Sequence, residues 1–335
     1  MTNSRELAKH LLGTALWPFP TKLVSKFMIG GKRGFILMFH YIGRPLINGA
    51  GNDLFLELAE FRRVLDFVAS NLCPMEPLEF LSGLQNENLP RGATLLTFDD
   101  CTERTVHAAL PEMLVRNLRG CFFANPGLID SGRTVPCLEL MRICAECQPG
   151  RYPLAWPQGM VIEVTNESSR AKAYKSLWPS VLACPSAKHE QLFASLRFDF
   201  AVARELTAET RLASWQALDR LDSTGMLVGN HTPFHSTVEA DGLDQFTRDV
   251  AEGYATLGAR FRSSCRVFCY PYGRTVDATP ETAERLKQLR TDFAFVTQGG
   301  IARAGQTGML GLRREGAVYT SGSTKLAPLL ACLRN

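Results

Sequence analysis

Several features that would assign a protein to a class are missing from this sequence of 335 residues. No apolar run is long enough to cross a bilayer, because Pro18 and Pro20 interrupt the one near the N-terminus, and no small-residue cleavage site of a signal peptide follows it. Dense runs of lysine and arginine are also missing, and the formal net charge is only +4, which gives no support for nucleic-acid binding. We expect a cytoplasmic protein. Residues 5–29, which mix basic and apolar groups, either cover one end of the fold or touch a membrane surface as a peripheral contact.

A disulfide framework is missing as well, although the chain has ten cysteines. Several of them lie inside apolar runs, such as Cys121 in 120–124 and Cys269 in 267–270, where a free thiol behaves as a small hydrophobic group. Cys144 and Cys147 form a lone CxxC pair. Because no second pair follows at the spacing of a zinc finger, a structural zinc ion there is the lesser interpretation. The cysteine pattern indicates a reducing compartment.

What the sequence does contain is an alternation of apolar runs and helical patterns. Helical spacing of apolar residues covers 55–70, 105–118 and 244–257. Near-continuous apolar runs between helices are typical of a parallel sheet, either open or closed into a barrel. Seven candidate strands predict a barrel short of the regular eight, and they lie at 35–39, 94–98, 120–124, 226–229, 267–270, 293–297 and 309–312.

The alternation breaks at residues 131–215, where six prolines accumulate. We interpret this segment as a mainly helical insertion over one end of the barrel, with a strand near 160–164 and helices near 168–182 and 187–212. We assign Trp156 and Trp178 to its small core and expect Trp215 to pack its helix against the barrel. The predicted organisation is an N-terminal helical segment 1–34, a barrel domain 35–320 that includes the insertion, and a C-terminal tail 321–335.

Polar residues follow the predicted strands where they end. His40 follows the first strand, and the adjacent Asp99 and Asp100 follow the second. His231 and His235 come after a later strand, four residues apart. In parallel α/β folds ligands bind at these strand ends, and one aspartate with two histidines can hold a divalent metal while leaving positions open for water and substrate. The simpler interpretations are an aspartate that caps the next helix and two polar loop histidines.

Three short motifs in this order resemble those of a known family. Thr97-Phe98-Asp99-Asp100 resembles the first motif of the NodB-homology polysaccharide deacetylases (carbohydrate esterase family 4). His231-Thr232-Pro233-Phe234-His235 resembles the second, and Tyr270-Pro271-Tyr272-Gly273 resembles the third. The run 36–41 is similar to the opening strand of many members. The resemblance extends over about residues 35–315.

This resemblance implies a deformed (β/α) barrel of the NodB-homology type and hydrolysis of N-acetyl groups on amino sugars. It implies a divalent metal, most often Zn²⁺ and sometimes Co²⁺ or Ni²⁺. Carried over by position, Asp100, His231 and His235 are the implied metal ligands and Asp99 is the implied general base. Tyr272 lies where the family supplies a backbone N–H to the oxyanion.

The chain departs from the family pattern in three places. Cys101 replaces the glycine that commonly follows the aspartate pair, and Cys269 or Tyr270 occupies the place of the arginine that orients the base, with Arg266 and Arg274 as nearby candidates. The late Leu-x-His that carries the general acid is absent, since no histidine follows His235. His40 is therefore a candidate acid, as in some branches of the family. Its simpler interpretation is a strand-end histidine hydrogen-bonded to a neighbouring loop.

We thus predict a metal-dependent hydrolase that removes an acetyl group from an N-acetylated carbohydrate, either an amino sugar, a polysaccharide or a glycoconjugate. One alternative retains the fold but acts on a small acylated amine or on a cyclic amide or imide. Another is a carbohydrate-binding pseudoenzyme without catalysis. The departures favour the pseudoenzyme slightly, whereas the complete Asp-Asp-His-His set argues against it.

Overall fold

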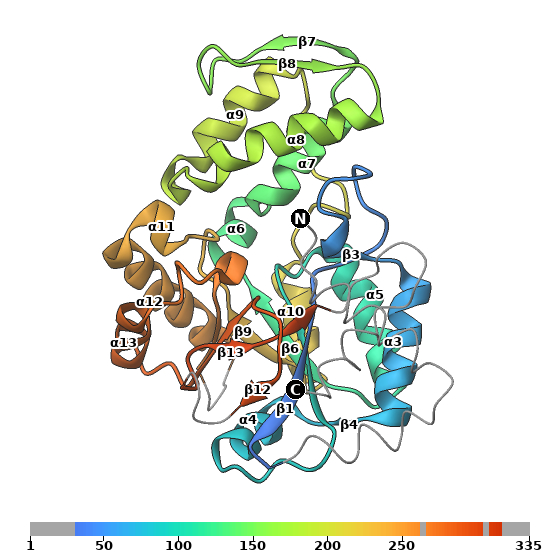
Figure 1. Cartoon of the computed structure of the whole chain (residues 1–335), viewed down its shortest axis with the longest axis vertical. Coiled ribbons are helices and arrows are strands. Elements are labelled where there is room, and N and C mark those ends of the chain that lie inside the picture. Colours follow the sequence, from blue (N-terminus) through green and yellow to red (C-terminus); the bar gives the residue numbers. More distant parts are fainter. Residues whose placement is uncertain (1–30, 262–265, 304–307, 317–335) are drawn as a thin grey trace, which may run out of the picture.

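A computed structural model describes residues 31–261, 266–303 and 308–316 of the chain. Its centre is a sheet of mostly parallel strands that curves into a nearly closed barrel (Figure 1). The sheet order is β12-β1-β5-β6-β9-β10-β11-β13. The strands are β1 (Arg33–Phe39), β5 (Ala93–Phe98), β6 (Gly120–Ala124), β9 (Leu227–Asn230), β10 (Val267–Cys269), β11 (Phe293–Val296), β12 (Ala302–Arg303) and β13 (Leu312–Arg313). The barrel class is confirmed, and the predicted strands lie within a few residues of the observed ones.

The last described segment brings the two ends of the sheet together. Strand β13 pairs with β11, and two residues later β14 (Glu315–Gly316) pairs with β1 in parallel. Arg314 lies between these two short strands. The predicted strand 309–312 begins too early, because residues 309–310 form a turn in which the Met309 carbonyl accepts a hydrogen bond from Ala294 N.

A stack of aromatic rings fixes the register of three neighbouring strands. Phe39, Phe98 and Phe122 are directly paired across β1, β5 and β6. Their rings stack with centroid distances of 4.9 Å and 4.4 Å. Cross-strand pairs of this kind stabilise one register over its neighbours. The residues that follow the stack, among them His40 and Asp99, are thereby placed side by side at one end of the barrel.

Helices cover the outside of the sheet. They are α3 (Leu58–Asn71), α4 (Pro77–Gln85), α5 (Glu103–Leu114), α10 (Trp215–Ser223), α11 (Val238–Asp241), α12 (Leu243–Arg260) and α13 (Pro280–Gln288). Helix α3 begins later than predicted, because Phe55–Leu56 form strand β3, which pairs with β2 (Tyr41–Ile42). Helix α5 begins earlier, since Thr102 caps it by accepting a hydrogen bond from Thr105 N. The remaining short elements are η1 (Asn52–Leu54), β4 (Cys73–Pro74) and η3 (Pro271–Gly273).

Most of the segment 131–215 lies above the strand-end face of the barrel (Figure 1). After α6 (Pro126–Ser131) it contains α7 (Pro136–Glu146), the hairpin of β7 (Gly150–Pro153) and β8 (Val161–Val164), α8 (Glu167–Leu182), η2 (Ser186–Lys188) and α9 (His189–Asp199). The predicted helix 187–212 is wrong beyond Asp199, because Ala201 has a positive φ of 52° that a helix cannot continue through.

These elements have a hydrophobic core of their own, separate from the cores of the barrel. Trp156 and Trp178 pack against it, whereas Trp215 packs against the barrel core, as predicted. Cys144 and Cys147 are both buried in the insertion core. No helix in the described ranges has the length and apolar character needed to cross a membrane. The predictions for 1–30 and for the tail 321–335 lie outside the described residues.

Candidate active site and metal centre

The structure gathers the predicted site residues at the strand-end face of the barrel. Asp99 and Asp100 follow β5, and His231 and His235 follow β9, all four with 4% or less of their surface exposed. Such burial is unfavourable for two adjacent carboxylates unless cations or hydrogen-bond donors surround them. The partners of each carboxylate therefore show what the site is built to hold.

The loop that carries the two histidines is held by asparagine side chains. Asn125, directly after β6, donates hydrogen bonds to the carbonyls of His231 (2.6 Å) and Thr232 (2.9 Å). Asn230 accepts one from Thr232 N (3.0 Å). Thr232 and His235 both have positive φ angles, of 57° and 58°. The loop is thus a specific non-helical turn that points both imidazoles at Asp100, rather than a helix start.

The donor atoms at Asp100 match a cation site. The Nε2 atoms of His231 and His235 each lie 3.4 Å from Asp100 Oδ1, an oxygen that is buried and has no hydrogen-bond partner in the described part of the chain. His231 Nδ1 donates to the Cys269 carbonyl at 2.8 Å, so in the neutral ring Nε2 is a bare lone pair. Electron pairs of three ligand atoms therefore converge within 4.8 Å of one another, which is the arrangement that a divalent metal requires.

The pKa shifts of Asp100 and His231 indicate that this cluster favours an added positive charge. Burial alone would raise the pKa of Asp100, but the two histidines beside its carboxylate, His231 and His235, lower it well below the usual value. Burial lowers the pKa of His231, yet Cys269 and Asp100 raise it well above normal. A proton and a metal ion would compete for the same Nε2 lone pair of His231.

The second carboxylate, Asp99, is paired with an arginine that the sequence analysis missed. Arg314, fully buried between β13 and β14, donates two parallel hydrogen bonds of 2.7 Å to the two oxygens of Asp99. Its Nε donates to the Val296 carbonyl at 3.1 Å, which fixes the plane of the guanidinium. Burial raises the pKa of Asp99, but Arg314, followed by His40 and His231, lowers it below the usual value. Asp99 is therefore ionised at neutral pH.

The two arginines proposed for this role lie elsewhere. Arg274 pairs with Asp277 and Glu239, and Arg266 donates to the Leu289 carbonyl. Arg314 takes the role expected of them, and its Nη2 lies 3.1 Å from the thiol of Cys269, the residue at the family's usual arginine position. The signal in the sequence was a pair of arginines, Arg313 and Arg314, directly after a predicted strand. Alternation along a strand sends one inward and one outward, but only barrel closure shows that the inward one reaches β5.

Asp100 has a further partner that the motifs do not include. The phenol of Tyr41 donates a hydrogen bond to Asp100 Oδ2, and it also lies 3.3 Å from the Cys137 thiol of helix α7. This contact occupies one carboxylate oxygen and leaves Oδ1 for the histidine side. Tyr41 thus connects the carboxylate to the insertion and fixes its orientation.

The remaining predicted residues surround this pair of carboxylates. His40 Nε2 lies 3.6 Å from Asp99 Oδ2, its side chain is 12% exposed, and burial lowers its pKa against the opposing effect of Asp99. Tyr272 lies in η3 with a φ of 59°, and its ring contacts His235 edge-on at 4.5 Å. The rings of Trp178, from α8, and Tyr272 pack in a T-shaped arrangement with centroids 5.5 Å apart, so the insertion reaches the site.

Cys101 shows how the chain accommodates the missing glycine. Its φ is 51°, a conformation that glycine adopts freely and other residues adopt at a cost of about 1–2 kcal/mol. The thiol is buried and donates to the Phe123 carbonyl at 3.2 Å. The turn after Asp100 therefore retains the glycine-like geometry, and the side chain packs against β6.

Comparisons with known proteins place the fold. Among solved structures, the Streptococcus pyogenes deacetylase PplD, crystallised with acetate, is 16% identical with a TM-score of 0.56, covering 89% of this chain and 96% of its own. IcaB from Ammonifex degensii is 18% identical with a TM-score of 0.56, covering 91% and 99%. A de-N-acetylase from Aggregatibacter actinomycetemcomitans is 11% identical with a TM-score of 0.53, covering 89% and 99%.

At such low sequence identities, these TM-scores establish a shared fold. No curated protein matches the sequence. The family model described as polysaccharide deacetylase, however, matches residues 86–291, which span β5 through α13 and include both carboxylates and both histidines. The chain belongs to the polysaccharide deacetylase family.

Proposed function

We propose that the protein is a metal-dependent hydrolase that removes an N-acetyl group from an amino sugar, a polysaccharide or a glycoconjugate. The observation that carries the proposal is the separation of the two adjacent carboxylates into different environments. Asp100 faces two histidine lone pairs, whereas Asp99 is held ionised by Arg314. A ligand and a base are the two roles that hydrolysis at such a site requires.

Asp100, His231 and His235 would hold the metal, with Zn²⁺ the best match to a mixed nitrogen and oxygen ligand set and Co²⁺ or Ni²⁺ as substitutes. When bound, the ion supplies a Lewis acid for the acyl carbonyl. The hydrogen bond from Tyr41 to Asp100 and that from His231 to the Cys269 carbonyl keep the ligand atoms in place before the ion arrives.

Asp99 is the general base of this proposal. Its carboxylate takes a proton from the water whose oxygen adds to the acyl carbon. Arg314 occupies one lone pair on each oxygen, and the Cys269 thiol donates to Oδ1 at 3.5 Å. The remaining lone pair of Oδ2, on the side of His40, therefore receives the proton. The lowered pKa keeps Asp99 available as a base through the neutral range, although it also makes Asp99 a weaker base.

His40 and Tyr272 complete the proposed reaction. The C–N bond breaks as the leaving amine receives a proton, and His40, on the Asp99 side of the site, is the candidate donor. The positive φ of Tyr272 turns its peptide out of the helical orientation, and we assign its N–H to the developing oxyanion. The adjacent Tyr272 carbonyl accepts a hydrogen bond from Thr297 Oγ1 at 2.6 Å, which holds this peptide segment.

The decisive experiment combines metal analysis with acetate release. Purified protein is expected to contain one divalent ion per chain and to release acetate from at least one member of a panel of N-acetylated sugars, oligosaccharides and polymers. Chelation should remove activity, and Zn²⁺ or Co²⁺ should restore it. A metal-loaded protein that binds carbohydrate without releasing acetate would instead establish the pseudoenzyme alternative. Release of a different acyl group, or opening of a cyclic amide, would establish the small-substrate alternative.

We further propose that the enzyme works in a reducing setting such as the cytoplasm. The eight cysteines in the described residues are all free. Five of them, Cys101, Cys137, Cys144, Cys147 and Cys269, are buried in the site or in the insertion core. Burial raises the pKa of each of these thiols, which keeps them protonated and unreactive.

A further inference from the structure

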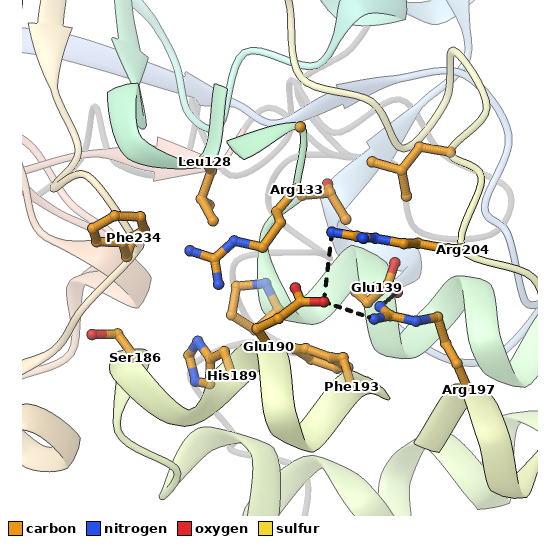
Figure 2. Close-up of a pocket in the computed structure, with 14 residues that line it drawn as sticks. Leu128, Arg133, Glu139, Ser186, His189, Glu190, Phe193, Arg197, Arg204 and Phe234 are labelled. Atoms are coloured by element: carbon orange, nitrogen blue, oxygen red, sulfur yellow. Dashed lines mark hydrogen bonds and ion pairs between the residues drawn. The ribbon is translucent and has the colours of Figure 1, made fainter. Parts of the chain in front are cut away.

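A second polar cavity lies between the insertion and the metal-binding loop. Figure 2 shows it bounded by α9, by the chain between α6 and α7, and by Phe234. Its space is about 450 Å³, a value that includes the open mouth. Leu128, Pro136, Phe193 and Phe234 supply apolar wall, and Arg133, Arg197, Arg204, Glu139 and Glu190 supply charge.

The charges around this cavity do not balance. The charge of Arg197 is compensated, because it donates to Glu139 at 2.7 Å and to Glu190 at 3.0 Å. Glu139 is shared with the buried Arg142 at 2.9 Å, and Arg142 also pairs with Glu146. Arg204 reaches only Glu190, at 3.7 Å, and its side chain is 70% exposed. One positive charge in excess of the glutamates remains at the cavity.

Arg133 carries this excess charge. Its guanidinium lies over the Phe234 ring, with Cζ 5.1 Å from the centroid, and its Nε donates to Ser131 Oγ at 3.0 Å. No carboxylate oxygen of the described residues lies within 4.0 Å of it, and Figure 2 shows it pointing into the space between Phe234 and Glu190. Burial lowers its pKa, and the more distant carboxylate of Glu190 opposes this effect only in part.

A second group at the cavity is also left unsatisfied. Thr134, the next residue, lines the cavity and is 7% exposed, and its hydroxyl has no hydrogen-bond partner in the described part of the chain. Buried hydroxyls are nearly always paired. Thr134 thus has a hydroxyl donor without an acceptor, beside the Arg133 guanidinium that has no carboxylate partner within 4.0 Å among the described residues. An anion could accept hydrogen bonds from both.

The position of the cavity relates it to the reaction. Phe234 forms part of its wall and lies between the two histidines of the metal centre in the sequence. The same loop is fixed to the cavity by a hydrogen bond from Leu128 N to the Pro233 carbonyl, at 2.9 Å. A group bound against Arg133 is therefore separated from the metal-binding loop by one aromatic side chain.

We propose that this cavity is a substrate subsite for an anionic group, a carboxylate or phosphate ester, carried by a sugar next to the acetylated one. The inference rests on the proposed deacetylase function and makes its substrate class narrower. Arg133 binds the anion with its planar pair of N–H donors, Arg204 swings from Glu190 to add a second contact, and Thr134 donates from the wall.

The test uses matched N-acetylhexosamine oligosaccharides that differ only in the neighbouring sugar, which is neutral, carries a carboxylate or carries a phosphate ester. The metal-loaded full chain should prefer one acidic substrate over the neutral one in kcat/KM. Arg133→Gln should lower kcat/KM on that substrate by about 10- to 100-fold, the range for a hydrogen bond to a charged group. The same variant should change the rate on the neutral substrate by less than about twofold. Arg133→Lys should recover part of the loss.

Arg151→Gln is the matched control. Arg151 is an exposed arginine on β7 of the same insertion, so its substitution removes the same charge away from the cavity. It should leave all three rates unchanged, and the melting temperature of Arg133→Gln should equal that of the parent. Inorganic phosphate should compete with the acidic substrate in the parent and not in Arg133→Gln. Equal kcat/KM on acidic and neutral substrates in the parent would overturn the subsite. Acetate release from none of the three, with metal bound, would instead count against the proposed function.

Discussion

The metal centre and the insertion cavity are two polar clusters with opposite imbalances. At the strand ends, Asp99 and Asp100 face one cation, Arg314, so one negative charge and two histidine lone pairs remain unmatched. At the insertion cavity, the arginines exceed the glutamates by one. Buried or half-buried charge persists only when something compensates for it. This contrast underlies our proposals of a cation site in the first cluster and an anion site in the second.

The two clusters also differ in how rigidly they are held. The carboxylates and histidines are each 4% exposed or less. Hydrogen bonds from Arg314 hold Asp99, one from Tyr41 holds Asp100, and one to the Cys269 carbonyl holds His231. Arg133 and Arg204 belong to connections of the insertion, and Arg204 is mostly exposed. Chemistry requires fixed atoms, whereas recognition of one substituent tolerates adjustment. The predictions below test this contrast, beginning with the change expected to have the largest effect.

Loss of a metal ligand should remove most activity. His231→Ala and His235→Ala each delete one of the three converging donor atoms, so the metal content should fall from one per chain to near zero and the rate by about 10³-fold or more. Elemental analysis and acetate release measure the two effects. His107→Ala, on the exposed face of α5, is the matched control. Full metal occupancy in both ligand variants would contradict the assignment.

Asp99→Asn should separate the base from the ligands. The amide retains the shape of the carboxylate but cannot accept a proton at neutral pH, so turnover should fall by about 10²–10⁴-fold. The metal content should stay at one, because the donor set of Asp100, His231 and His235 is untouched. If the variant instead loses its metal, Asp99 and Asp100 must exchange roles.

His40→Gln should lower the rate on amides by about 10²–10⁴-fold if His40 protonates the leaving amine. Burial lowers the pKa of His40. The alkaline limb of kcat/KM, where the acid loses its proton, should therefore lie below the ordinary histidine value of about 6.5 and disappear in the variant. An activated ester, whose leaving group needs little protonation, should be spared. Equal losses on ester and amide would assign His40 to positioning instead.

Arg314→Lys should have an intermediate effect that appears in the pH profile. Lysine retains the charge but cannot make two parallel hydrogen bonds, so the free energy of unfolding should fall by about 1.5–3 kcal/mol. The pKa of Asp99, which Arg314 lowers against the effect of burial, should rise, and the acid limb of the rate should move to higher pH.

The stability effect of Asp99 has a definite sign. A carboxyl whose pKa is lowered by folding stabilises the protein above the pKa of the unfolded chain, about 3.9, and this contribution is lost as the pH falls through the folded value. In Arg314→Lys, where the folded pKa of Asp99 is higher, this contribution should be smaller and should be lost over a narrower range of pH below about 3.9. Arg266→Lys, whose guanidinium donates only to the Leu289 carbonyl in the described residues, should leave both profiles unchanged. If the acid limb of the rate were unshifted in Arg314→Lys, Arg314 would not be the group that lowers the pKa of Asp99.

Cys101→Gly should have the smallest effect. Glycine relieves the positive φ of 51°, a gain of about 1–2 kcal/mol, and loses the buried thiol and its bond to the Phe123 carbonyl, a loss of similar size. The melting temperature and the turnover should stay close to the parent values. A large loss of metal or rate would show that the thiol, rather than the backbone turn, positions Asp100.

The sequence alone determined the parts of this protein that depend on local pattern. Apolar runs followed by His40, by the aspartate pair and by the HxxxH segment established the strands and the residues at their ends, since a strand and the turn after it are read within a few residues. The three motifs identified the family for the same reason. The helix predicted over 187–212 failed beyond 199, because Ala201 ends it through a backbone angle that no periodicity reveals.

Only the tertiary structure decided which distant residues complete the site. Arg314 reaches Asp99 because the last strands close the barrel against β1, and this contact joins residues 215 positions apart. Tyr41 reaches Asp100 across 59 positions. Arg133 has no carboxylate within 4.0 Å among the described residues, because Glu139 and Glu190 pair with Arg197 and Glu190 also faces Arg204. Such pairings depend on register, closure and packing of separate elements, which a pattern along one chain does not encode.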